Sequence, residues 1–251
     1  MRDYKEFLKA VKSKELRLSF TSFNKLQKSP RHFLEHYTKE FKSTAPMVFG
    51  SLVHCLVLEP ETFDKRYVIS PTFDKRTKAG KQGYKDFVSL SEGLEVVSEK
   101  EYKEALFAIE GLKSCKPALE LLRDATETEK KIRFKYKGLT ISGIVDGLNP
   151  NFRFDLKTTQ DASPKNFKWS VRKYCYHLQA AIYTYENQEP FYIIALEKSG
   201  NCAVYELSEN LINSGRVLFE ELITKYKKCS FLECWNQSYS FSAPDGVHVL
   251  E

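Results

Sequence analysis

Three charged residues near the middle of the chain, Asp146, Asp155 and Lys157, have the types and spacing of a metal-dependent site. Side chains alternate between the two faces of a strand, so Asp155 and Lys157 would share a face about 6–7 Å apart. A short turn at residues 149–151 would return the chain and bring Asp146 beside Asp155. Two carboxylates about 4 Å apart repel by about 4 kcal/mol at an effective dielectric constant of 20. A cation would relieve this repulsion, and an all-oxygen ligand set favours Mg²⁺, with Mn²⁺ as the alternative.

A simpler interpretation needs no metal. Asp155 and Lys157 could form an exposed ion pair while Asp146 caps a turn, and such surface pairs are common and weak. Spacing alone favours this interpretation, so the elements around the three residues must decide between the two.

Alternation of charged and apolar residues predicts the strands that would position these side chains. We expect strands at 131–136, 139–146 and 152–157, with a further pair at 190–197 and 202–207. The strand at 152–157 places apolar side chains on one face, and Asp155 and Lys157 on the other.

Capping residues and prolines predict the helices. They are expected at 2–13, from Ser22 to Lys28 with a stop at Ser29-Pro30, at 46–58, from Ser98 to Leu112, from Ser163-Pro164, at 175–186, and from Ser208 to Lys228. Residues 74–83 are basic and contain glycine, which predicts a mobile loop. This order predicts one α/β domain over 1–251: a mainly helical part (1–125), a mixed sheet core flanked by helices (126–207), and a C-terminal helix and tail (208–251).

Basic residues are concentrated in two segments. The 251-residue chain carries a net charge of +6, but residues 130–173 contain eleven Lys and Arg against three acids, a net +8. The first 42 residues contain eleven basic residues against five acidic ones. A polyanion is the natural partner for such a charge distribution, although any single lysine can simply solvate an exposed face.

Membrane and secreted classes are not expected. The longest apolar run, residues 191–196, is far shorter than the ~20 residues that span a bilayer. The first residues carry mixed charge with no apolar segment behind them, so we expect no signal peptide. Six cysteines without a C-x-x-C pair predict reduced thiols and a cytoplasmic protein, although four of them could still hold an iron–sulfur cluster.

The carboxylates and the lysine occur with other motifs that together resemble the PD-(D/E)XK nuclease superfamily. Asp146 and Asp155-Leu156-Lys157 match its core acid and (D/E)-x-K, and Gly143-Ile144-Val145-Asp146 is similar to the G-x-(I/V)-D of the RecB-like branch. Glu129 resembles that branch's upstream acid, with Glu127 as the alternative. Gly50 to His54 is similar to its G-x-x-x-H element, and Gln179 to Tyr183 to its Q-x-x-x-Y helix.

A narrower resemblance is to the RecE-type exonucleases (exodeoxyribonuclease VIII) of phages and prophages. The similar blocks lie in order between about residues 18 and 207, and they are SPRHF (29–33), FGSLVH (49–54) with LEP (58–60), DKRTKAGK (74–81) and DLKTTQDA (155–162). Ser199-Gly200-Asn201, where the family would have a proline, is a small departure.

The resemblance implies roles for individual residues. Asp146, Asp155, the Leu156 carbonyl and His54 would bind the metal, while Lys157 would stabilise the attacking hydroxide or the phosphate. Glu129 would orient water or complete a second metal shell, and Gln179 would belong to the catalytic set. Arg76, Lys78, Lys81 and Tyr183 would contact DNA.

Other interpretations of these residues stay open. The basic segment could be a solvated loop, His54 a satisfied core residue, and Tyr183 a buried packing residue. Trp169 and Tyr174, which lie among lysines and arginine, could stack on an unpaired base, although core packing explains Trp169 equally well.

The implied activity is hydrolysis of linear double-stranded DNA from the 5′ end, which leaves 3′ single strands for recombination. The implied partners are DNA ends, a single-strand annealing protein and further copies of the chain in a ring. The alternatives are a repair or CRISPR-type nuclease of the same superfamily with an iron–sulfur cluster, and a DNA-binding module without catalysis.

Overall fold

The computed structural model describes residues 3–239 and is built around a mixed sheet of five strands. The strand order is β3-β4-β5-β6-β7, in which β5 and β6 run parallel and the other neighbours run antiparallel. The strands are β3 (Glu127–Tyr136), β4 (Leu139–Asn149), β5 (Phe152–Thr159), β6 (Phe191–Glu197) and β7 (Cys202–Glu206). The predicted mixed sheet flanked by helices is confirmed.

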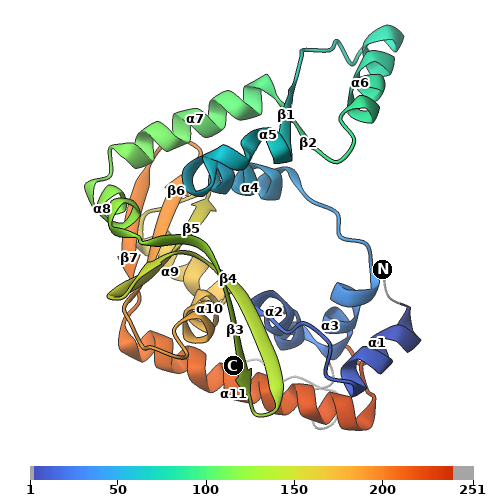
Figure 1. Ribbon diagram of the computed structural model, residues 1–251, viewed down its shortest axis with the longest axis vertical. Coiled ribbons are helices and arrows are strands. Elements are labelled where there is room, and N and C mark those ends of the chain that lie inside the picture. The colour runs from blue at the N-terminus through green and yellow to red at the C-terminus, as the bar shows by residue number, and fades with distance from the viewer. Residues whose placement is uncertain (1–2, 240–251) are drawn as a thin grey trace.

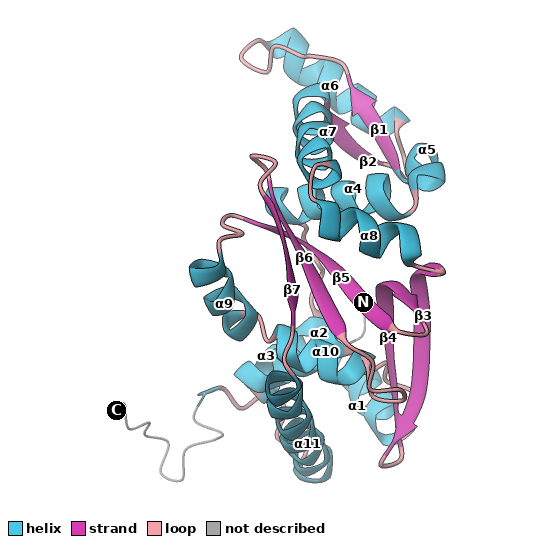
Figure 2. Ribbon diagram, turned by 90° about the vertical axis from the view of Figure 1, so that its left-hand side faces the viewer, coloured by secondary structure: helices cyan, strands magenta, loops and turns pink. Residues whose placement is uncertain are grey.

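Helices cover both faces of this sheet, and each face has its own apolar core (Figure 2). One core packs the sheet against α4 (Ala45–Leu58), α7 (Glu99–Lys113) and α8 (Lys116–Asp124). The other packs it against α1 (Tyr4–Lys12), α2 (Phe20–Lys28), α3 (Pro30–Thr38), α9 (Pro164–Lys173), α10 (Tyr176–Tyr183) and α11 (Glu209–Leu232). Strand alternation sorts the side chains: Phe154 and Leu156 of β5 enter the first core, which leaves Asp155 facing the opposite side.

A smaller lobe projects from one end of the molecule (Figure 1). It contains β1 (Tyr67–Ser70), which pairs in parallel with β2 (Glu95–Ser98), and α6 (Lys78–Leu90) between them. The short helices η1 (Pro60–Thr62) and α5 (Phe63–Arg66) connect α4 to β1. We call β1, β2 and α6 the outer lobe.

Local capping explains most helix starts. Ser98 and Glu101 form the predicted capping box of α7, and Ser208 caps α11 as expected. The prediction that Ser22 caps α2 is wrong. Ser19 is the N-cap, and Ser22, the third residue of the helix, is its partner in the capping box.

Three further expectations are corrected. Ser29-Pro30 ends α2 but also starts α3, because Ser29 accepts a hydrogen bond from the His32 amide and proline is tolerated in a first turn. The basic segment 74–83 is a loop only as far as Thr77, which caps α6. The sequence patterns also missed α8 and the four-residue strands of the outer lobe.

Within residues 3–239, none of the helices combines the length and the apolar character that a bilayer crossing requires.

Candidate metal and phosphodiester site

The candidate site lies where α4 meets the middle of β5 and the neighbouring part of β4. The backbone of Leu156 in β5 contacts both β4 and α4: its amide donates to Asp146 Oδ2 at 2.7 Å, and its carbonyl oxygen lies 2.6 Å from His54 Nε2. Because a carbonyl oxygen only accepts, Nε2 carries the hydrogen of this bond. The other ring nitrogen of His54, Nδ1, therefore faces the carboxylate of Asp146, at 3.5 Å from Oδ2.

A glycine allows α4 to approach β5 closely. A Cβ built at Gly50 would lie 3.1 Å from Thr158 Oγ1, tighter than most contacts of this kind. Gly50 lies one turn before His54 on α4, so the close approach also sets the imidazole against the β5 backbone.

Glu129 completes a group of three possible ligands. One possible ligand atom from each of His54, Glu129 and Asp146 lies within 4.8 Å of the other two. Among residues 3–239, this is the one group of three or more His, Cys, Asp or Glu side chains that could hold a metal ion. Glu129 has a left-handed backbone (φ 48°), and its neighbours pair with β4 while Glu129 itself stands outside the ladder. Of the two acids that the sequence left open, the structure brings Glu129 to the site; Glu127 instead pairs with Lys130.

Asp155 forms a second, adjacent arrangement with Lys157 and Gln179. Its Oδ2 lies 2.6 Å from Lys157 Nζ, and its Oδ1 accepts a hydrogen bond of 2.6 Å from Gln179 Nε2. Asp155 and Gln179 are buried, whereas Lys157 is partly open to solvent. The Asp155–Lys157 pair is therefore not the exposed surface ion pair of the simpler interpretation.

Burial and neighbouring charges shift the pKa values of Asp146, His54 and Lys157. Burial, and secondly the charge of Asp155, raise the pKa of Asp146 to about 7. Burial alone would lower the pKa of His54, but the carboxylates of Asp146 and Glu129 outweigh it and raise that pKa. Burial also opposes the charge of Lys157, yet Asp155 and Asp146 raise the pKa of its ammonium above the ordinary value.

These residues fit a divalent cation. Burial and a second carboxylate both oppose the ionisation of Asp146, and a bound cation would favour it. The imidazole Nδ1 of His54 and the carboxylate of Glu129 supply further ligand atoms close to it. Asp146, Glu129 and His54 are thus the side chains that would hold the ion. Asp155, which the sequence also assigned to the metal, contacts Lys157 and Gln179.

The residues predicted to contact DNA fall into two places. Arg76, Lys78 and Lys81 are exposed in the outer lobe around the start of α6, where Arg76 pairs with Asp74 at 3.0 Å. Tyr183 is instead buried at the end of α10, and burial raises its pKa to about 12.

Tyr183 packs against the sheet. A Cβ at Gly143 would lie 2.6 Å from the Tyr183 ring, so the glycine of the G-x-(I/V)-D motif makes room for it. This placement favours the packing role for Tyr183 that the sequence left open.

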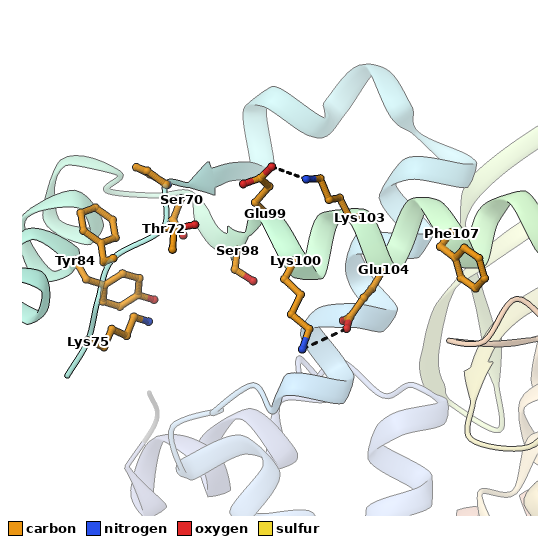
Figure 3. Close-up of a pocket in the computed structure, with 12 residues that line it drawn as sticks. Ser70, Thr72, Lys75, Tyr84, Ser98, Glu99, Lys100, Lys103, Glu104 and Phe107 are labelled. Carbon is orange, nitrogen blue, oxygen red and sulfur yellow. Dashed lines mark hydrogen bonds and ion pairs between the residues drawn. The ribbon is translucent and has the colours of Figure 1, made fainter.

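A groove of about 670 Å³ in the outer lobe is separate from the carboxylate cluster. Figure 3 shows it along α7, where Glu99 pairs with Lys103 and Lys100 with Glu104, while Lys75 lies 3.3 Å from the ring centre of Tyr84. Its acids are thus already neutralised by neighbouring lysines, and its lining residues belong to the segments around α6 and α7.

Two residues that the sequence patterns did not predict support the framework of the site. Arg153 is buried, donates to the Tyr183 carbonyl and lies 3.3 Å from Glu189, which anchors β5 to the end of α10. Tyr176 places its ring centre 5.2 Å from Lys157 Nζ. The position of Tyr176 three residues before Gln179 on the same helix was the signal that could have found it.

The cysteines form two close pairs, Cys115 with Cys202 and Cys229 with Cys234, and not one cluster of four. All six are free, and in residues 3–239 the groups of three or more possible ligands include no cysteine. The arrangement therefore does not support the iron–sulfur alternative.

Comparison with known proteins decides the family. A protein family described as a PDDEXK-like domain of unknown function (DUF3799) matches residues 19–238. The chain belongs to this PDDEXK-like family. The predicted PD-(D/E)XK superfamily is thereby confirmed, whereas the narrower RecE type stays a prediction. None of the curated proteins matches the chain.

One solved structure shares the fold. The crystal structure of a "Putative exonuclease" from Eubacterium rectale has a TM-score of 0.65 at 14% identity, over 100% of this chain and 95% of that one. At this identity the likeness shows the fold of the PDDEXK-like chain. A second structure, SSO0001, covers 85% of this chain and 95% of its own at 17% identity, but its TM-score of 0.30 is too low to support an argument.

Proposed function

We propose that this PDDEXK-like protein is a divalent-metal-dependent nuclease that hydrolyses DNA phosphodiester bonds. The observation that carries the proposal is the convergence of His54, Glu129 and Asp146 on one point, beside the buried pair of Asp155 and Lys157. A binding module would need only surface cations. Asp146 is a buried carboxylate with a raised pKa, and its ionised form would repel a phosphate backbone unless a cation is bound between them.

The residues divide the chemistry between them. When bound by His54, Glu129 and Asp146, Mg²⁺ or Mn²⁺ would lower the pKa of a coordinated water and neutralise charge on the phosphate. Lys157 stays an ammonium because its pKa is raised, so it can stabilise an attacking hydroxide or the charge on the phosphate. Gln179 fixes Asp155, and Asp155 in turn holds the ammonium in place.

The narrower proposal is a RecE-type exonuclease, supported by the order and spacing of the motifs from residue 18 to 207. It would degrade linear duplex DNA from 5′ ends and leave 3′ tails for strand annealing. The proposal includes an annealing protein as partner, a ring of identical chains and a cytoplasmic location. Exposed Lys78 and Lys81 in the outer lobe would hold the duplex through its phosphates.

Substitution of Lys157 tests the nuclease proposal. Lys157→Ala should reduce Mg²⁺-dependent digestion of linear duplex by about 10²–10³-fold, the usual effect of removing one charge-stabilising group, while DNA binding is largely retained. Lys113→Ala, which removes an exposed lysine paired with Glu110, is the matched control and should digest normally. Undiminished digestion by Lys157→Ala would refute the assignment.

Loss of Lys157 also leaves the Asp155 carboxylate buried without its partner, which could destabilise the fold. Asp146→Asn therefore serves as a second inactive variant, and a thermal unfolding curve of each variant separates loss of catalysis from loss of structure.

Labelled ends test the narrower proposal. A linear duplex labelled separately at its 5′ and 3′ ends should lose the 5′ label first, and a closed circular duplex should persist. Early loss of the 3′ label would contradict the proposed polarity, and digestion of the circle would identify an endonuclease.

A further inference from the structure

A row of aromatic rings leads from the candidate site to the surface. The ring of Tyr176 lies beside the Lys157 ammonium, and it stacks on the ring of Tyr174 with centres 5.8 Å apart and planes 29° from parallel. Tyr174 is 47% exposed. Lys173 Nζ lies 5.4 Å from the centre of the Tyr174 ring. The pair Tyr174 and Tyr176, which we call the tyrosine platform, therefore connects the proposed catalytic lysine with solvent.

The exposed side of α9 continues this row with positive charge. Phe167 and Val171 bury the other side of the helix, which leaves Lys165, Lys168, Trp169 and Arg172 exposed. Trp169 is 66% exposed, so the core-packing interpretation of this residue is wrong. Figure 2 shows α9 at the margin of the molecule, next to β7.

Acidic partners do not neutralise this side of α9. In the part of the chain that the structure describes, no carboxylate lies within ion-pair distance of Lys165, Lys168, Arg172 or Lys173. By contrast, lysines of α7 such as Lys100 and Lys103 each have a glutamate partner. The free cations of α9 are available to a ligand that brings its own negative charge.

An unusual backbone conformation holds the platform together. Cys175, between the two tyrosines, is left-handed with φ 58°, a conformation that costs a residue with a side chain roughly 1–2 kcal/mol. Cys175 separates α9 from α10. In a continuous helix, side chains two residues apart point to different faces, so the break at Cys175 allows Tyr174 and Tyr176 to stack. The Cys175 thiol donates to Gln27 Oε1 of α2, which helps to hold this turn. Strain of this kind is concentrated at functional sites.

We propose that the tyrosine platform and the exposed side of α9 bind single-stranded DNA and guide it to Lys157. Exposed aromatic faces accept unpaired bases, and cations spaced along a helix accept the phosphates of the same strand. A duplex offers its phosphates but keeps its base faces stacked on one another, so it cannot use the rings. This inference rests on the proposed nuclease function, because it places the bound strand next to the reacting phosphate.

The binding test needs no metal and no cleavage. Oligo(dT) of about 12 nucleotides is titrated into the full chain in EDTA, and tryptophan fluorescence is recorded. Only two tryptophans are present, and Trp235 is fully buried, so quenching should come from Trp169 and should disappear in Trp169→Phe. A strand of the same length without bases, and a blunt hairpin duplex, carry comparable phosphates without free base faces.

We expect Tyr174→Ala to weaken oligo(dT) binding by about 5- to 150-fold, the range for loss of one stacked base, and to leave binding of the abasic strand unchanged. Tyr176→Phe should bind normally, whereas Tyr176→Leu should bind weakly. Phe231→Ala, which removes an even more exposed aromatic ring on α11, is the control and should have no effect. Circular dichroism of each variant reports on folding.

Two results would overturn the proposal that the tyrosine platform binds single-stranded DNA. One is equal affinity of the wild type for oligo(dT) and for the abasic strand, and the other is wild-type affinity of Tyr174→Ala for oligo(dT). Failure of the nuclease proposal gives a different pattern, in which base-dependent binding in EDTA persists and digestion with Mg²⁺ is absent. The two proposals can therefore fail separately.

Discussion

The carboxylate of Asp146 should destabilise the metal-free protein as it ionises. Its pKa rises from 3.8 to about 7 on folding, a difference of about three units. Each unit corresponds to 1.36 kcal/mol, so ionised Asp146 opposes folding by on the order of 4 kcal/mol. Because the folded pKa is the higher one, the folded state binds the proton more tightly. The stability that this proton confers is complete below pH 4 and is lost as the pH rises through 7.

Asp146→Asn removes this ionisation and keeps an oxygen that can accept the hydrogen bond from the Leu156 amide. In EDTA, the variant should therefore gain stability relative to wild type between pH 4 and pH 8, up to on the order of 4 kcal/mol. Urea unfolding of both proteins at pH 4.5, 6, 7 and 8 measures the difference at each pH. Comparing the two proteins removes the titration of shared groups far from the site, whereas His54, whose pKa the Asp146 carboxylate raises, contributes to the measured difference.

Asp124→Asn is a control of opposite sign. The hydrogen bond from the Arg123 side chain lowers the pKa of Asp124, so its ionised form stabilises the fold. Wild type should be the more stable protein at neutral pH, and its advantage should shrink as the pH falls below 4. A constant difference between wild type and Asp146→Asn from pH 4.5 to 8 would refute the electrostatic account of the site.

Three further predictions concern the site and its supports. Millimolar Mg²⁺ or Mn²⁺ should raise the melting temperature of wild type at pH 8 more than at pH 6, since protons compete for the ligands; calorimetry of His54→Ala should show this gain abolished, and an equal gain in that variant would exclude His54 as a ligand. Glu129→Gly should be about 1 kcal/mol more stable in EDTA than Glu129→Ala in urea unfolding, because glycine adopts the left-handed backbone without strain; equal stabilities would contradict that reasoning. Gly215→Ala would place a Cβ 2.1 Å from the backbone oxygen of His177 and should destabilise the packing of α11 on α10 by about 1–3 kcal/mol or more, whereas Gly83→Ala meets only a movable ring and should be nearly neutral by the same measurement.

The sequence predicted the elements in which local signals agree. Alternation in β3 to β5 and the capping residues of α7 and α11 placed the sheet and its flanking helices close to their observed bounds. The strands β1 and β2 escaped because each has four residues, too few for a period to be recognised, and they pair only with each other across α6. The start of α3 was missed because Ser29-Pro30 both ends one helix and begins the next.

The site was predictable as a set of residues but not as a geometry. The D-x-K spacing and the short turn between β4 and β5 predicted that Asp146, Asp155 and Lys157 are neighbours. The resemblance also assigned Glu129 and Gln179 to the site, but it did not predict that Glu129 groups with His54 and Asp146 from a left-handed backbone while Asp155 contacts Gln179. A local pattern carries no sign of such a conformation at a glutamate, because it is imposed by tertiary structure.

The contact between His54 and the Leu156 carbonyl joins positions 102 residues apart. Closing a loop of that length is slow compared with forming any single helix or hairpin. The imidazole therefore meets the carboxylates only when α4 packs against β5, which is a tertiary event and not a local one. An incompletely folded chain would therefore lack a complete ligand set, and so would a fragment released by cleavage between α4 and β5. Neither could damage nucleic acid in its surroundings.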